Sequence, residues 1–135
     1  ITVNVPTGGG LNTQAYLGYK TSQATTYTAT GVSVTITKTG TYHISWAGSR
    51  STSSGTSGSE IHINGTKYGS SYTSFTHTYW QNPVINNVSL SAGDVVEVYA
   101  RARSASYYMD VGNLIVTESD GTSIISIDDE FIEGE

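Results

Sequence analysis

Apolar and polar side chains alternate with a period of two along much of the chain. Apolar side chains recur at every second position in VSVTI (32–36) and again in YHISW (42–46). Successive side chains of a strand point to opposite faces, so this pattern predicts strands with one buried face. No segment carries the capped apolar stripe that predicts a helix. We therefore expect an all-β chain, with Tyr42 and Trp46 in its core.

Turn signals divide the alternating pattern into short segments. Asn64-Gly65 predicts a tight hairpin, because both central positions of that turn need positive φ. The Ser/Gly-rich stretch 48–59 predicts an exposed loop. Leu114-Ile115-Val116 is apolar on both faces, which favours a central strand that is covered twice, as by a neighbouring subunit. In total we expect about eight to ten short strands, at the spacing typical of sandwiches and jelly rolls.

Composition narrows the class of protein. The 135 residues fit one domain, which we place at residues 1–127, followed by an acidic tail at 128–135. Charged residues make up 13% of the chain, about half the usual share. The net charge of −5 comes from the tail, and the neutral body offers no electrostatic footprint for nucleic acid or an anionic membrane. No stretch is long and apolar enough for a membrane helix, so we expect no membrane insertion.

Four segments, in order, carry a resemblance to a known family: TGTYHISW (39–46), IHING (61–65), VSLSAGDVV (88–96) and VGNLIV (111–116). In the third, Leu90 and Val96 are expected to be buried, Gly93 allows the turn and Asp94 bonds its backbone. This order resembles the C1q/tumour-necrosis-factor-like domain of bacterial or phage type. The resemblance implies an antiparallel two-sheet jelly-roll sandwich and a homotrimer at the end of a fibrous or modular protein.

No constellation of residues predicts catalysis. His43, His62 and His77 lie in strand-like runs without the spacing of a metal site or a nucleophile motif. The acidic residues of the body lie mostly at predicted turns and strand ends. We therefore predict no catalytic residues, no cofactor and no metal site.

Aromatic residues give the candidate binding sites. Ten Tyr and two Trp exceed what a small core needs, so several must face outward. Flat aromatic faces stack on sugar rings or anchor protein interfaces. Two arginines on a Tyr-bearing face would bind a carboxylate or pair with Glu60 or Glu97. The predicted ligand-binding residues are Tyr79, Trp80, Tyr99, Arg101, Arg103, Tyr107 and Tyr108.

Three functions follow from these observations. The first is a non-catalytic trimeric head or tip domain of a bacterial or phage surface or fibre protein, which binds a glycan or protein receptor on a cell surface. It would lie outside the cell, on a cell surface or a virion. The second is a monomeric carbohydrate-binding module appended to a glycan-degrading enzyme. The third is a structural spacer without a ligand. Solution mass separates the first from the second.

Overall fold

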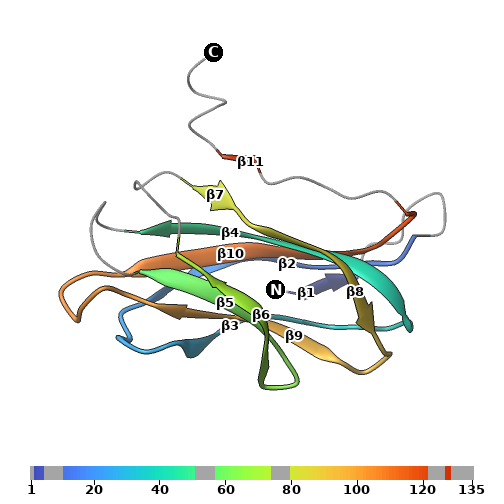
Figure 1. The fold of residues 1–135 in the computed structure, drawn as a ribbon, viewed down its shortest axis with the longest axis horizontal. Coiled ribbons are helices and arrows are strands. Elements are labelled where there is room, and N and C mark those ends of the chain that lie inside the picture. The colour runs from blue at the N-terminus through green and yellow to red at the C-terminus, as the bar shows by residue number, and fades with distance from the viewer. Residues whose placement is uncertain (1, 5–10, 51–56, 74–79, 122–126, 129–135) are drawn as a thin grey trace, which may run out of the picture.

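The alternating segments form eleven strands in a computed structural model, which describes residues 2–4, 11–50, 57–73, 80–121 and 127–128 (Figure 1). The strands are β1 (Thr2–Asn4), β2 (Thr13–Ser22), β3 (Thr28–Thr35), β4 (Gly40–Arg50), β5 (Gly58–Ile63), β6 (Thr66–Tyr72), β7 (Gln81–Asn82), β8 (Val84–Leu90), β9 (Val95–Arg101), β10 (Met109–Glu118) and β11 (Ile127–Asp128). In this described part of the chain no helix is long and apolar enough to cross a membrane.

Two antiparallel sheets stack face to face (Figure 1). Among the described residues, one sheet has seven strands in the order β1-β2-β10-β4-β7-β11, with β8 also paired to β4. The other has four, in the order β3-β9-β5-β6. This arrangement confirms the predicted all-β sandwich and is consistent with a jelly roll. The strand count exceeds the predicted eight to ten because β1, β7 and β11 have only two or three residues each, too few to show alternation.

The core lies between the two sheets and uses the inward faces that alternation predicts. Tyr42 and Ile44 are fully buried, and Trp46 is 2% exposed. The indole Nε1 of Trp46 donates a hydrogen bond to Ser59 Oγ at 2.8 Å, which joins β4 to β5 across the core. Burial of these side chains is the main stabilising contribution in a domain of this kind.

Strand β10 is central, as the doubly apolar segment predicts, because it pairs with β2 on one side and β4 on the other. Leu114 and Val116 are fully buried in the core. Ile115 points to the outer face of the sheet and is partly exposed. Of these three side chains, two therefore point into the core and one points outward.

The Asn-Gly hairpin between β5 and β6 is confirmed, with φ of 52° at Asn64 and 81° at Gly65. The Asn64 side chain also donates to Asp94 Oδ1 at 3.0 Å and accepts from the Val95 amide at 2.9 Å, so it ties this turn to the start of β9. The predicted loop at 48–59 is wrong at both ends. Strand β4 continues to Arg50, and Ser57, Gly58 and Ser59 are buried. Small side chains allow the two strand ends to pack closely here, and residues 51–56 lie outside the described part.

Candidate functional site

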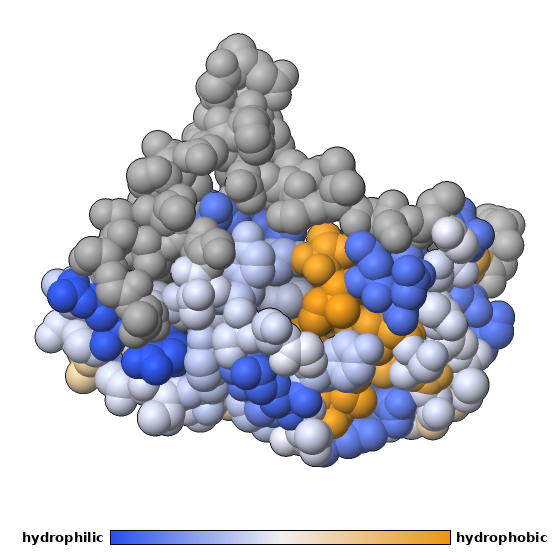
Figure 2. Space-filling view, viewed as in Figure 1, coloured by the Kyte–Doolittle hydropathy of each residue, from blue (hydrophilic) through white to orange (hydrophobic). Residues whose placement is uncertain are grey.

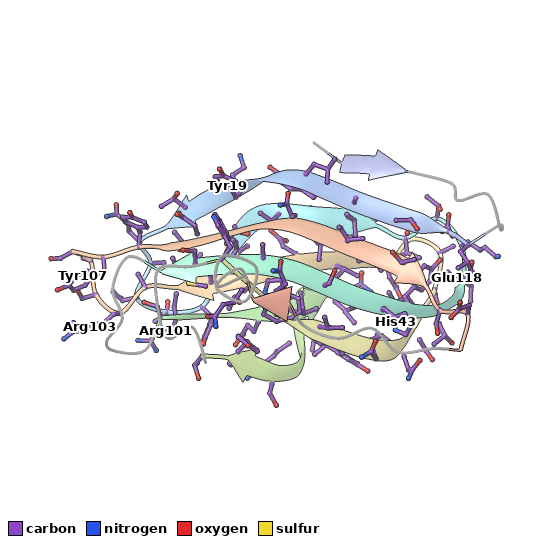
Figure 3. All side chains as sticks on the ribbon, turned by 90° about the horizontal axis from the view of Figure 1, so that it is seen from above. Tyr19, His43, Arg101, Arg103, Tyr107 and Glu118 are labelled. Carbon is purple, nitrogen blue, oxygen red and sulfur yellow. The ribbon has the colours of Figure 1, made fainter. Side chains whose placement is uncertain are left out.

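An aromatic pair lies on the outer face of the seven-stranded sheet. The ring centroids of Tyr19 and Trp80 are 4.9 Å apart and the ring planes are tilted by 45°. Tyr19 stands on β2 and is 61% exposed, and Trp80, just before β7, is partly exposed. Figure 3 shows Tyr19 on β2. We call Tyr19 and Trp80 the aromatic platform.

Small residues allow the two rings to meet across two intervening strands. Gly112 of β10 is the register partner of both Tyr19 on β2 and Ala47 on β4. A Cβ atom at Gly112 would overlap the Gly18 carbonyl oxygen and the Tyr19 Cβ. The small residues Gly112 on β10 and Ala47 on β4 therefore leave room for the platform.

A bulge in the sheet borders the platform. The register of β10 shifts between Gly112 and Leu114, and Asn113 has a φ of 46°. Opposite it, Gly18 has a φ of 99°, and its amide donates to Asn113 Oδ1 at 3.0 Å. Bulges bend a strand and redirect neighbouring side chains, and they are frequent beside functional sites. Here the bulge lies directly beside Gly112, the register partner of Tyr19.

Polar groups flank the platform. Thr21, two residues beyond Tyr19 on β2, donates to Asp110 Oδ1 at 2.6 Å. Asn113 is exposed on the other side of Gly112. Aromatic rings with hydroxyl, amide and carboxylate groups beside them match the needs of a sugar, which has apolar C–H faces and polar edges.

Two Arg–Tyr pairs come from β9 and the loop that follows it. The Arg101 guanidinium carbon lies 6.0 Å from the centre of the Tyr27 ring, and that of Arg103 lies 5.3 Å from the centre of the Tyr107 ring. Such pairs are stabilised by the charge on the face of the ring. Tyr108 is 42% exposed. Figure 3 shows Arg101, Arg103 and Tyr107 at one end of the sandwich.

A hydrogen-bonded cluster occupies the outer face of the four-stranded sheet. Glu60, only 4% exposed, lies 2.6 Å from His62 Nε2 and accepts from Ser71 Oγ at 2.6 Å. The His62 ring stacks on Tyr99 with centroids 3.5 Å apart. Desolvation by burial raises the pKa of Glu60, but the hydrogen bonds from Ser71 and His62 and the charge of Lys67 outweigh it, so the pKa lies below its ordinary value of 4.5.

A groove lies between β6 and β8, at the side of the sandwich. It encloses about 370 Å³. Residues 69–72 form one wall and residues 83–86 the other, and Trp46 contributes to the floor. Figure 2 shows hydrophobic side chains gathered on this face, in the region where Figure 1 places β8.

The predicted site residues are distributed over several surfaces. Trp80 belongs to the platform, Arg103, Tyr107 and Tyr108 lie at one end, and Tyr79 is outside the described residues. Tyr99 and Arg101 share an outer face, as alternation predicts, but His62 covers one face of the Tyr99 ring. Of the two carboxylates considered for Arg101, Glu60 bonds His62 and Ser71 and Glu97 accepts from the Gly31 amide, and within the described residues neither forms an ion pair with Arg101.

Sequence reasoning missed Tyr19. The available signal was the outward repeat of Leu17 and Tyr19, two large side chains on one face of a strand, of which Leu17 is 52% exposed. The side chains that line the groove were missed as well. They come from segments far apart in the sequence, and their proximity depends on how the two sheets stack.

Comparison with known proteins supports the fold. No protein-family model and no curated protein matches the sequence. Similar solved structures include the CBM36-1 domain of a multidomain xylanase from the hindgut metagenome of Trinervitermes trinervoides, at 17% identity and a TM-score of 0.50, covering 90% of this chain and 88% of that one. Another is a carbohydrate-binding module CBM36 in complex with calcium and xylotriose, at 16% identity and a TM-score of 0.48, covering 87% and 88%. At this identity, the first likeness shows that the chain shares the β-sandwich of such a module.

Proposed function

We propose that this chain is a carbohydrate-binding module that holds a glycan against the aromatic platform. The observation that carries the proposal is the pair of an exposed Tyr19 and a partly exposed Trp80 on the outer face of the seven-stranded sheet. Aromatic side chains provide a large apolar contact at low cost in rotamer entropy, and the nearby Thr21, Asp110 and Asn113 offer hydrogen bonds to sugar hydroxyls. The proposed activity is binding, without catalysis.

Xylan and xylo-oligosaccharides are the first ligands to test, because the solved module with the similar sandwich is part of a xylanase. Calcium has no role in the proposal. Among the described residues, no three His, Cys, Asp or Glu side chains form a group that could hold a metal ion.

The test is calorimetric titration of a panel of soluble glycans into the intact chain and its variants. We expect Tyr19→Ala and Trp80→Ala each to weaken binding at the platform at least tenfold, which corresponds to about 1.4 kcal/mol. Tyr68→Ala, which removes another exposed tyrosine from β6, is the matched control and should bind as the parent does. If Tyr19→Ala and Trp80→Ala bind at the platform as tightly as the parent and the control do, this site is refuted.

The trimeric surface-protein head is the second candidate, and one observation favours it. Leu17 and Tyr19 are exposed on β2, and Ile115 is partly exposed on the outer face of the adjoining β10. Exposed apolar surface of this kind is often buried against another subunit. Light scattering coupled to size exclusion, at several concentrations, distinguishes the two. A constant trimer favours the head domain, whereas a monomer leaves this face open to a glycan.

A further inference from the structure

We propose that the groove between β6 and β8 is a second glycan-binding site, separate from the aromatic platform. The inference takes its class of ligand from the proposed function, but it rests on different residues. The groove volume of about 370 Å³ lies within the range typical of small-molecule sites. Each wall is a run of four consecutive residues, roughly 10 Å long in extended backbone, so the groove suits an oligosaccharide chain better than a single sugar.

The floor of the groove is rigid and apolar. Trp46 is fixed by two hydrogen bonds, from its indole Nε1 to Ser59 and from its backbone amide to the Pro83 carbonyl at 3.2 Å. Ile85 packs partly against the core and partly lines the groove. Gly69, with a φ of 74°, has no side chain, and a Cβ there would lie 3.7 Å from Ile85 Cδ1. The walls therefore approach each other without closing the groove.

Polar groups along the rim complete the match to a sugar. Ser70, Ser71 and Asn86 line the groove, and none of its lining residues is charged. The Ser71 hydroxyl is itself engaged, because it donates to Glu60 and also bonds the Tyr27 side chain. A mostly apolar lining that carries neutral hydroxyl and amide groups favours an uncharged glycan over an anionic or cationic ligand.

The two strand edges argue against a peptide that binds by adding a strand. A peptide that adds to a sheet needs a regular edge with an unbroken row of backbone groups. Strand β6 is interrupted by the left-handed Gly69, and β8 by Asn87 with a φ of 60°, beside a register shift. Irregular edges of this kind discourage strand pairing. A glycan needs no such ladder.

The chain contains two tryptophans, and each belongs to one of the two sites. Their indole N–H signals in a nitrogen–proton correlation spectrum therefore report on the groove (Trp46) and on the platform (Trp80) separately. The probes are xylohexaose and cellohexaose, titrated into the intact chain. We expect both signals to shift, with independent affinities.

Ser70→Trp fills the groove from an exposed position of β6, and Thr66→Trp places the same side chain on the same strand, away from the groove. With Ser70→Trp we expect the Trp46 response to be lost and the Trp80 response to be kept. The Thr66→Trp control should keep both responses. With Tyr19→Ala and Trp80→Ala combined, groove binding should persist, as followed by the Trp46 signal.

The possible results separate the two proposals. If Ser70→Trp leaves every response unchanged, the groove site is refuted and the platform stands. If the platform double variant binds as tightly as the parent and Ser70→Trp abolishes binding, the platform is refuted and the groove stands. If the parent binds neither hexasaccharide nor any glycan of the panel, both proposals fail. If an extended peptide library, but no glycan, displaces the Trp46 signal, the glycan assignment of the groove is wrong.

Discussion

The rings of Tyr19 and Trp80 lie 4.9 Å apart although the residues come from opposite halves of the chain. Strands β10 and β4 separate them in the sheet, and contact is possible because Gly112 and Ala47 are small. The platform is therefore a property of sheet register as much as of the two aromatic residues. This dependence makes Gly112 a sensitive position for substitution.

Gly112→Ala should destabilise the domain by about 1–3 kcal/mol, the usual cost of overpacking. The new Cβ would overlap the Gly18 carbonyl oxygen and the Tyr19 Cβ, and the backbone partner cannot move aside as a flexible side chain does. Chemical denaturation of the variant and the parent measures the change, provided that the unfolding free energy of both falls with denaturant concentration at the same slope.

Gly40→Ala is the matched control for this prediction. At Gly40 the tightest neighbour of an added Cβ is Glu118 Oε2, at 3.0 Å, the far end of a side chain that can move. A smaller cost at Gly40 than at Gly112 is expected. Equal costs at both positions would contradict the claim that the packing beside Tyr19 requires a residue without a side chain at position 112.

The sequence predicted the features that depend on local chemistry. Alternation identified the buried faces of β3, β4 and β9, and the Asn64-Gly65 turn follows from the backbone freedom of those two residues. Trp80 was identified as a candidate because it is a large aromatic residue at a strand end. These inferences need only neighbouring residues.

The sequence could not predict the features that depend on register and stacking. Tyr99 was assigned correctly to an outer face, but its partner His62 lies on β5, where antiparallel pairing places His62 opposite Glu97 and Glu60 opposite Tyr99. In the same way, Tyr19 becomes part of a site through its pairing with Gly112. Long-range pairing of this kind follows from the whole fold and leaves no mark on a short segment of sequence.

Stability should fall as the pH is lowered below about 4.5. The pKa of Glu60 is lowered in the folded chain, as are those of Asp94, by hydrogen bonds from the Ser91 amide and Asn64, and Glu118, by a hydrogen bond from the Asn12 amide. A lowered folded pKa means that the unfolded chain takes up protons first. The stabilisation is present above the ordinary pKa and is lost as the pH falls through the folded pKa.

Urea midpoints at pH 7 and pH 3 measure this effect, and Glu60→Gln isolates the contribution of the buried carboxylate. The variant should be less stable than the parent at pH 7 and should lose less stability on acidification. Since Lys67 and His62 face Glu60, raising the salt concentration tests whether their charges contribute. An identical acid loss in parent and variant would show that Glu60 is not responsible.

Trp46→Phe should destabilise the domain by about 2 kcal/mol, because it leaves the fully buried Ser59 hydroxyl without its donor and removes part of the core. Adding Ser59→Ala removes the unsatisfied hydroxyl. The double variant should therefore lose less stability than the sum of the two single variants. If the loss of stability in the double variant equals the sum of the losses in the two single variants, the hydrogen bond contributes nothing measurable.

Asn113→Ala should lower both stability and glycan affinity, because this residue shapes the strand beside the platform. Its φ of 46° is costly for alanine, by about 1 kcal/mol, and the substitution also removes the oxygen that accepts from the Gly18 amide. Asn113→Gly keeps the backbone conformation without strain but loses the same oxygen, so it separates the two effects.

If the bulge directs Tyr19, affinity for the platform ligand should fall most in the alanine variant, with the Trp80 indole signal displaced even before ligand is added. If the folded Asn113→Ala variant binds the platform ligand as tightly as the parent does, Tyr19 is oriented by its contact with Trp80 and not by the bulge.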